Sequence, residues 1–245
     1  MVRFVYTTQE RNNNMDFDIK NVLKDIKDKK KISISYLQRT YSIGFVKANK
    51  EFSKLVETGY VSSEGEVQTA KVYEALGETY DPGIKIVFLD VDGVLNCSST
   101  KDKCGYYTGI EDEKVTFLKK IVEATNAKIV LVSTWKYYWY KEPNLKEQQD
   151  EMANYLDLKL KKQGLIIIDK TEDEAINRGD GILEYIRHLK WKGIKVNKFI
   201  IIDDEIFDYK ETKLTKNLIQ TGFYGGGLQA KHVIRAIDKL GGNNG

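Results

Sequence analysis

Hydrophobic and polar residues follow two different patterns along the chain, and the pattern in the second part is clearer. From residue 84 onward, short apolar runs rich in Ile and Val are separated by longer amphipathic segments. The apolar runs are IKIVFL, AKIVLV, LIII, KFIII and NLIQTG, and the helical patterns cover Glu113–Thr125, Leu145–Lys162, Gly181–Lys190 and LQAKHVIRAIDKL. Continuous apolar runs of this length are typical of strands buried on both faces. Their alternation with helices predicts an α/β fold with a parallel sheet.

The first part of the chain has helical periodicity, followed by a strand-like segment. Helices are predicted over DFDIKNVLKDIKDKK, ISYLQRTY and FVKANKEFSKLVETG, the last with Phe45, Ala48 and Leu55 among the residues of its apolar face. Gly59 is expected to end that helix as its C-cap, and YVSSEGEVQTAKVY is expected to form a hairpin. Three helices and a hairpin predict a small winged helix-turn-helix domain.

The two patterns meet in LGETYDPGIK, where Asp81-Pro82-Gly83 is a strong turn signal. The expected organisation is an N-terminal extension at 1–15, a winged-helix domain at 16–75, a linker at 76–84 and an α/β domain at 85–240. The glycine- and asparagine-rich end at 241–245 is expected to be disordered.

Composition adds little to this picture. A chain of 245 residues with 41% hydrophobic and 31% charged residues is typical of globular proteins, and a net charge of +3 permits a nucleic-acid partner without requiring one. Cys97 and Cys104 lack the further ligands of a zinc site and are expected to be free thiols. No apolar run is long enough to cross a membrane, and the start does not resemble a signal peptide, so a cytoplasmic location is expected.

Acidic residues follow two of the predicted strands. Asp90 and Asp92 come directly after the run in KIVFLDVDGVLN, and Asp203 and Asp204 end the run in FIIIDDEIFD. The carboxyl ends of parallel strands share one edge of a sheet, so these carboxylates are expected to cluster. An all-oxygen cluster without His or Cys suits Mg²⁺. A calcium loop of the EF-hand type is disfavoured, because Gly93 is misplaced for it and its glutamate is missing.

Two further groups could meet a bound anion at this edge. The run AKIVLVSTWK ends in Ser133 and Thr134, whose hydroxyl and backbone N–H groups are candidates for holding a phosphoryl oxygen. Arg178 stands at the start of the predicted helix in NRGDGILEYI and is a candidate cation for the bound anion. The N-terminus of that helix would favour an anion at the same place.

These segments resemble the motifs of the haloacid dehalogenase-like (HAD) superfamily, whose fold is a Rossmann-like parallel sheet. FLDVDGVLN matches the first motif, hhhhDxDG, while LVST matches the second and IIIDD the fourth. The surrounding residues are similar to the HAD branch of Swiss-army-knife RNA repair proteins, over about Lys85 to Leu240. In the third motif, Arg178 stands where most HAD enzymes have a lysine, and Lys136 and Lys170 are rival candidates for that role.

The resemblance implies a Mg²⁺-dependent phosphatase, a phosphoric monoester hydrolase, that works in two steps. Asp90 would attack phosphorus to form an aspartyl-phosphate, and Asp92 would protonate the leaving oxygen and then activate water. The four acids would hold Mg²⁺, with Asp90, the Asp92 carbonyl and Asp203 as its main ligands. Ser133 and Arg178 would help to neutralise the charge of the phosphoryl group.

The spacing of the motifs leaves room for only a minimal cap over the site. Cys97 to Lys128 is expected to hold a short flap and one helix, and Lys136 to Gly164 a loop and one helix. An open site suits a phosphate carried by a polymer or a protein, or a partner that closes it. The cluster WKYYWY, with Lys136 and Lys141, is a candidate for stacking bases beside a basic rim, and half of its rings are expected to pack on the sheet instead.

The N-terminal segment SISYLQRTYSIGFVKANKEFSKLVETGYVS resembles the DNA-binding gamma domain of FtsK-type translocases, over about Asp16 to Tyr73. Of the family's base-reading positions, here Val46, Lys50 and Ser53, only Lys50 keeps a suitable polar reach, so the domain is expected to retain the shape and lose that sequence preference. The expected contacts with nucleic acid, DNA more than RNA, are Arg39, Lys47, Lys50 and Lys54. A solvated helix face, or a role in protein contacts, is the alternative.

Three functional hypotheses follow from these patterns. The first is a Mg²⁺-dependent phosphohydrolase that acts on a nucleic-acid end and is delivered by the winged helix. The second is a nucleic-acid-binding or assembly protein whose HAD domain is not catalytic. The third is a phosphatase for a nucleotide or a phosphoprotein, which keeps the chemistry without the nucleic acid.

Overall fold

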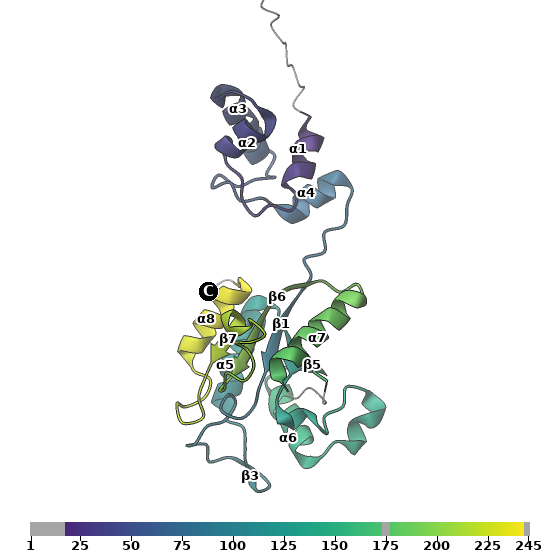
Figure 1. Ribbon diagram of the computed structural model, residues 1–245, viewed down its shortest axis with the longest axis vertical. Helices are drawn as coiled ribbons and strands as arrows, with labels where there is room; N and C mark the ends of the chain where they lie inside the picture. The colour runs from purple at the N-terminus through teal and green to yellow at the C-terminus, as the bar shows by residue number, and fades with distance from the viewer. Residues whose placement is uncertain (1–17, 173–176, 243–245) are drawn as a thin grey trace, which may run out of the picture. The chain divides into compact units, whose positions relative to one another are not determined.

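The computed structural model describes residues 18–172 and 177–242 of the chain (Figure 1). The predicted extension at 1–15 and residues 243–245 of the predicted disordered end lie outside the described residues. The chain divides between Asp81 and Pro82 into two compact units, and this division falls within the segment predicted as a linker.

The C-terminal unit is built on a five-stranded parallel sheet with the strand order β5-β4-β1-β6-β7. Its strands are β1 (Ile84–Leu89), β4 (Lys128–Leu131), β5 (Ile167–Lys170), β6 (Val196–Asp203) and β7 (Leu218–Gln220). Each strand overlaps one of the apolar runs that predicted it, because the run supplies Ile and Val to both faces of a covered sheet. The predicted α/β fold class is therefore confirmed.

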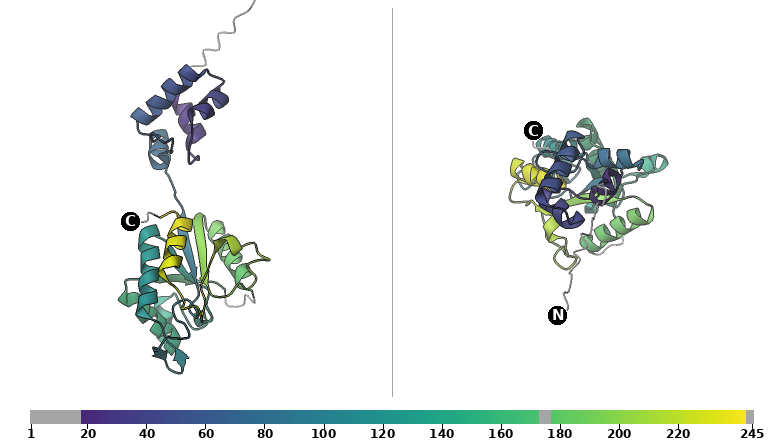
Figure 2. Two further views of the ribbon diagram at one scale, coloured as in Figure 1. Left: turned by 90° about the vertical axis from the view of Figure 1, so that its left-hand side faces the viewer. Right: turned by 90° about the horizontal axis from the view of Figure 1, so that it is seen from above.

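Helices cover both faces of the sheet. They are α5 (Asp112–Thr125), α6 (Glu151–Lys162), α7 (Arg178–Trp191) and α8 (Ala230–Leu240). Figures 1 and 2 show α5 and α8 side by side on one face, with α7 on the other. None of the described helices is both long and apolar enough to cross a bilayer.

The side chains of the strands alternate between two hydrophobic cores. On β1, Val87 and Leu89 pack into the core under α5, α6 and α8, whereas Ile86 and Phe88 pack into the core under α7. All four are fully buried. This alternation fixes the register of β1, since a shift by one residue would exchange the two faces.

The connections between the motifs are short, as predicted. Between β1 and α5 lies a small hairpin of β2 (Lys103–Cys104) and β3 (Tyr107–Thr108), which is the predicted flap. Cys97 and Cys104 are buried and free, which confirms that prediction. After β4 come the 3-10 turns η1 (Thr134–Lys136) and η2 (Pro143–Gln148) and then α6. The predicted helix Leu145–Lys162 is thus divided, because Asp150 caps α6 by accepting a hydrogen bond from the Ala153 N–H at 2.8 Å.

The N-terminal unit contains α1 (Ile19–Ile26), α2 (Ile34–Tyr41), α3 (Phe45–Glu57) and α4 (Thr69–Leu76) around a separate core. Gly59 adopts a φ of 70° just after α3, in the left-handed region that favours glycine. The prediction for the apolar face of α3 was wrong at Phe45, whose ring is 60% exposed.

The predicted hairpin Tyr60–Tyr73 is correct only in its first part. Val61 and Val67 form an antiparallel bridge around the turn, and the chain then enters α4 at Thr69. Val72 of α4 is fully buried in the helical core, so tertiary packing overrides the strand preference of this β-branched residue. The predicted winged helix-turn-helix therefore stays a prediction.

Packing of the sheet can be tested at Phe88. Its ring makes edge-to-face contacts with Tyr185 and Phe199, at centroid distances of 5.8 and 5.7 Å. We expect Phe88→Ala to lower the free energy of unfolding by about 3–5 kcal/mol, because it leaves a cavity in the core. Urea denaturation measures the loss. The matched control is Tyr106→Ala, which removes a fully exposed ring and should change the free energy of unfolding by no more than about 0.5 kcal/mol. Equal losses of stability in the two variants would contradict the packing described for Phe88.

Candidate active site

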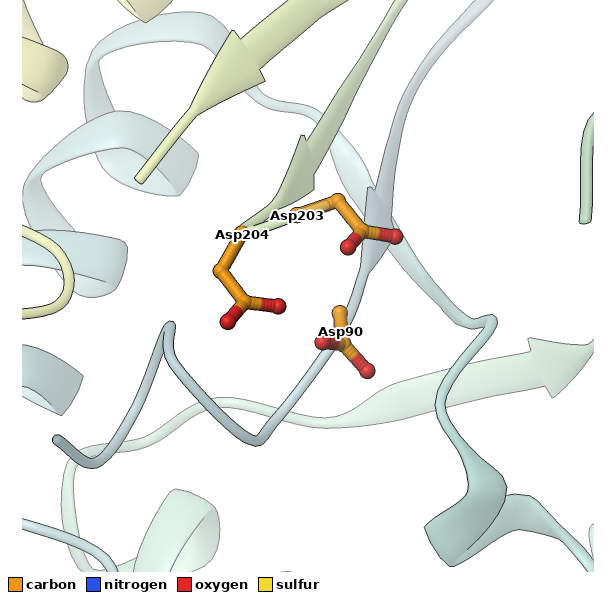
Figure 3. A group of neighbouring side chains, drawn as sticks. All are labelled: Asp90, Asp203 and Asp204. Carbon is orange, nitrogen blue, oxygen red and sulfur yellow. The ribbon is translucent and has the colours of Figure 1, made fainter. Parts of the chain in front are cut away.

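The sheet brings acidic residues together at the carboxyl ends of two neighbouring strands. Asp90 follows β1 and donates its backbone N–H to the carbonyl of Ile202 on β6, at 3.0 Å, and Asp203 is the last residue of β6. Asp90, Asp203 and Asp204 each offer an oxygen, and these oxygens lie within 4.8 Å of one another. Figure 3 shows the three side chains at the strand ends, around one shared space. Asp92 lines the same cleft as Asp90 and Asp204.

Arg178 supplies positive charge to this cluster. Its Nη1 lies 3.1 Å from Oδ1 of Asp90 and donates a hydrogen bond to Oδ2 of Asp203 at 2.6 Å. Arg178 is the first residue of α7, and the N-terminus of that helix is held by Asp208, which accepts hydrogen bonds from the N–H groups of Gly179 and Asp180 at 2.8 and 3.1 Å. Asp208 therefore positions the helix that presents the guanidinium.

Asp203 and Asp90 differ in how well their oxygens are satisfied. Asp203 is fully buried and also accepts hydrogen bonds from the Tyr209 hydroxyl at 2.8 Å and the Glu205 N–H at 3.0 Å. Oδ1 of Asp90 is buried and accepts no hydrogen bond, despite its proximity to Arg178. A buried carboxylate oxygen without a hydrogen-bond donor needs positive charge to compensate its lost solvation, and the Arg178 Nη1 that pairs with this oxygen is shared with Asp203. The oxygens of Asp90, Asp203 and Asp204 thus fit a hard cation such as Mg²⁺.

Burial, followed by the crowding of negative charge, raises the pKa values of two of these acids. Burial, and then the charge of Asp203, raise the pKa of Asp90 to about 7, while Arg178 opposes the shift. Burial and the charge of Asp203 also raise the pKa of Asp204 above its usual range. Without a bound metal ion, the three carboxyl groups therefore resist being ionised all at once.

Asp92 has both of its carboxylate oxygens engaged. Oδ1 accepts a hydrogen bond from Asn96 Nδ2 at 2.8 Å, and Oδ2 accepts one from the indole N–H of Trp135 at 2.9 Å. Gly93 follows with a φ of 68°, and a Cβ at this position would overlap the Asp204 carboxylate. Glycine is therefore required here both by the backbone conformation and by the close approach of the acid.

The remaining predicted residues are divided between the site and its surroundings. Ser133 is buried at the end of β4, and its hydroxyl helps to hold down the pKa of Asp90. Thr134 begins η1, is exposed and does not line the cleft. Lys136 Nζ donates hydrogen bonds to the Thr171 hydroxyl and to a neighbouring carbonyl, and Lys170 Nζ donates to the Lys136 carbonyl. Among the three candidate cations, the structure thus brings Arg178 to the acids.

The cleft above the acids has a volume of about 600 Å³ and is partly lined by aromatic rings. These belong to Phe207, which follows β6, and to Phe223 and Tyr224, which follow β7. Sequence patterns did not identify them, although the glycines of TGFYGGGL mark a loop at this edge of the sheet.

The cluster WKYYWY, which was a candidate for base stacking, is only partly exposed. Trp135 and Trp139 are buried in the core, whereas Tyr137 and Tyr138 are exposed. Two of the five rings are thus buried, two are exposed and that of Tyr140 is half-buried, which agrees with the expectation that about half would pack inward. Lys136 is also buried, so the predicted basic rim was wrong at this residue.

The N-terminal candidates for nucleic-acid contact differ in their exposure. Arg39 and Lys50 are exposed, and Lys47 is half-buried. Lys54 forms an ion pair with Glu51 one helical turn earlier, at 2.9 Å, so its charge is partly compensated. Val46 at the start of α3 is 83% exposed.

Comparison with known proteins gives one match. The family described as the HAD domain in Swiss Army Knife RNA repair proteins matches residues 86–233. This span runs from β1 into α8 and contains every acid of the cluster, so the resemblance predicted from the motifs is confirmed for this unit. No curated protein and no solved structure matches the chain.

The raised pKa of Asp90 makes the stability of the metal-free protein depend on pH. Because the pKa of Asp90 is about 7 in the folded protein and about 3.9 in an unfolded chain, only the folded state keeps this proton between these values. We expect the free energy of unfolding in EDTA to fall as the pH rises through this window, and Asp90→Asn to remove most of that fall. Chemical denaturation at several pH values measures it.

The matched control is Asp238→Asn, which changes an exposed carboxylate on α8. It should retain the pH dependence of the wild type. If Asp90→Asn retained the same fall as the wild type, the shifted titration would have to be assigned to another group.

Proposed function

Because the chain belongs to the family of HAD domains found in Swiss Army Knife RNA repair proteins, we propose that it is a Mg²⁺-dependent phosphohydrolase of phosphate monoesters. The observation that carries the proposal is the unsatisfied buried oxygen of Asp90 beside Asp203 and Arg178, at the base of an open cleft. A purely structural ion pair does not require a second and a third carboxylate facing the same space.

In the proposed reaction, Asp90 is the nucleophile. Its oxygen attacks phosphorus, the bond from phosphorus to the leaving oxygen breaks, and an aspartyl-phosphate forms. Asp92 donates a proton to the leaving oxygen in this step. In the second step Asp92 takes a proton from water, the water oxygen attacks phosphorus, and cleavage of the bond to Asp90 releases phosphate and restores the free acid.

Electrostatic stabilisation comes from groups around Asp90. Asp90, Asp203 and Asp204 would hold Mg²⁺, and the bound ion would neutralise charge on the phosphoryl oxygens. Arg178 faces the same acids and would bind a phosphoryl oxygen, and Ser133 lies close enough to Asp90 to orient it. Thr134 has no role in this proposal, because it lies outside the cleft.

The surroundings of Asp92 suit an acid that must also act as a base. Asn96 and Trp135 donate hydrogen bonds to its two oxygens, which fixes the orientation of the carboxyl plane. For Asp92 to deliver a proton, one of these hydrogen bonds must be exchanged for one to the leaving oxygen. The side chain is exposed in the cleft, where this exchange can take place.

We further propose that the substrate is the phosphorylated end of a nucleic acid or a nucleotide, and that the N-terminal unit targets the protein to DNA. The short connections around the cleft and the exposed Arg39 and Lys50 support this proposal. The paired state of Lys54 reduces its expected contribution. A phosphoprotein substrate, or a HAD domain that does not turn over, is the competing outcome of the tests below.

Phosphate release tests the chemistry directly. With Mg²⁺, we expect the wild type to release phosphate from an aryl phosphate and from 3′- or 5′-phosphorylated oligonucleotides, and EDTA to abolish the release. Asp90→Asn should show no turnover, and Asp92→Asn should lower kcat by about 10²–10⁴-fold. Asp238→Asn is the matched control and should keep the wild-type rate. If wild type and Asp90→Asn are equally inert on every substrate, the protein is not this enzyme.

Salt dependence tests the targeting. Duplex DNA binding should weaken steeply as salt rises, because each phosphate contact releases counterions. We expect Lys50→Ala and Arg39→Ala each to reduce the slope of log K against log salt by about 1. Lys162→Ala, an exposed lysine on the C-terminal unit, should not change the slope. The targeting proposal fails if the protein does not bind duplex DNA at low salt, or if its binding is indifferent to salt.

A further inference from the structure

The outer part of the active-site cleft carries three aromatic residues that the proposed chemistry does not use. Phe207, Phe223 and Tyr224 line the same cleft as Asp90 and Arg178, and we call them the aromatic rim. We infer that the aromatic rim binds a nucleobase, so that the substrate is a phosphomonoester in which a sugar joins the phosphate to a base. This inference rests on the proposed function for the position of the phosphate.

The aromatic rim exposes large aromatic side chains to solvent at the mouth of the cleft. Tyr224 is 90% exposed and Phe207 is 45% exposed, while Asp90 at the base of the cleft is 2% exposed. Phe223 and Tyr224 meet edge to face, with ring centroids 5.4 Å apart, and this contact leaves most of the Tyr224 side chain accessible to a ligand. Single exposed rings are common on protein surfaces, but three around one charged cleft form a patch that indicates ligand binding.

Phe207 links the aromatic rim to the charged part of the site. The guanidinium carbon of Arg178 lies 4.2 Å from the centroid of the Phe207 ring. Phe207 also has a φ of 41°, a left-handed conformation that costs energy for a residue with a side chain. Contact with the guanidinium helps to offset that cost. A ligand whose phosphate meets Arg178 therefore has an aromatic surface directly beside it.

Phe223 and Tyr224 are held at the cleft by the backbone of their loop. The carbonyl of Phe223 accepts a hydrogen bond from the N–H of Ser98 at 3.0 Å, and the Thr221 hydroxyl donates to the carbonyl of Gly93 at 2.7 Å. Both partners belong to the segment that follows Asp90 and Asp92. The backbone that carries the two rings is therefore anchored to the segment that holds the acids, and its position does not depend on a separate domain.

The order of charged and aromatic groups along the cleft favours a nucleotide. A ring joined directly to the phosphate, as in phosphotyrosine, would stay close to the buried Asp90 at the base of the cleft. A sugar between phosphate and base carries the ring outward to the exposed Tyr224. Stacking on aromatic side chains accepts any of the bases, because each has a π face. A cleft of about 600 Å³ has a suitable size for a ligand of this kind.

Binding can be measured apart from turnover. In full-length Asp90→Asn protein with Mg²⁺, isothermal titration calorimetry gives Kd values for adenosine 5′-phosphate, adenosine 3′-phosphate, ribose 5-phosphate and phosphotyrosine. We expect the better-bound adenosine phosphate to bind at least about tenfold more tightly than ribose 5-phosphate, since stacking stabilises a bound base by this order. Addition of Tyr224→Ala should reduce the ratio to about twofold or less.

The matched control is Trp191→Ala, which removes an exposed ring at the opposite end of α7 from Arg178, roughly 20 Å away along the helix. It should keep the full ratio. A trinucleotide with a terminal phosphate is compared with one whose terminal residue is abasic, which isolates the contribution of the terminal base. If the trinucleotide binds more tightly than the mononucleotide, the site is assigned to strand ends.

Three results would overturn the inference, and two of them concern the base: equal Kd values for adenosine phosphates and ribose 5-phosphate, or a ratio that Tyr224→Ala leaves unchanged. Tighter binding of phosphotyrosine than of either adenosine phosphate would also overturn it. The proposed function fails by a different result, the absence of phosphate release by protein that retains Asp90. A base preference in binding without turnover would thus support the aromatic rim and remove the catalytic proposal.

Discussion

The C-terminal unit depends on how the buried charge at the ends of β1 and β6 is balanced. Asp90 and Asp203 follow adjacent apolar strands, so the sheet that gives the domain its stability also removes two carboxylates from water. Burying such charges is costly unless a cation meets them. Arg178 provides part of the positive charge that these carboxylates need, and Asp208 holds the helix that presents Arg178. The position of α7 and the loop after β6 are therefore tied to the same electrostatic requirement.

Arg178 compensates the two acids unequally, and this difference is what suits the site to chemistry. Asp203 receives donors from Tyr209 and Glu205 as well, and is thereby held in one place. Asp90 retains a buried oxygen without a donor and a raised pKa. A fully satisfied carboxylate is held firmly in place, whereas an incompletely satisfied one keeps a lone pair that the proposed attack on phosphorus requires. The structure thus combines a firmly held acid and an incompletely satisfied acid at the ends of neighbouring strands.

The sequence predicted those features that depend on local pattern. Runs such as IKIVFL predicted the strands and their ends, and the strand ends predicted which acids would meet. It did not predict contacts between distant segments. The hydrogen bond from Trp135 to Asp92 spans 43 positions, and nothing in the periodicity around Trp135 separates a ring that packs inward from one that binds a base. The helix α4 was missed for the same reason, since Val72 is buried by a core that forms only in the folded unit.

In the loop after β7, the backbone anchors the loop and the side chains line the cleft. Its attachment to the segment after Asp90 uses the carbonyl of Phe223, a group that every amino acid possesses, while the surface it offers to a ligand is formed by the rings of Phe223 and Tyr224. Substitutions at these two positions can therefore alter which molecules the protein accepts without moving the groups that would react with phosphate. Selection could retune substrate preference here one codon at a time, and a laboratory seeking a new specificity would begin by randomising the same two codons.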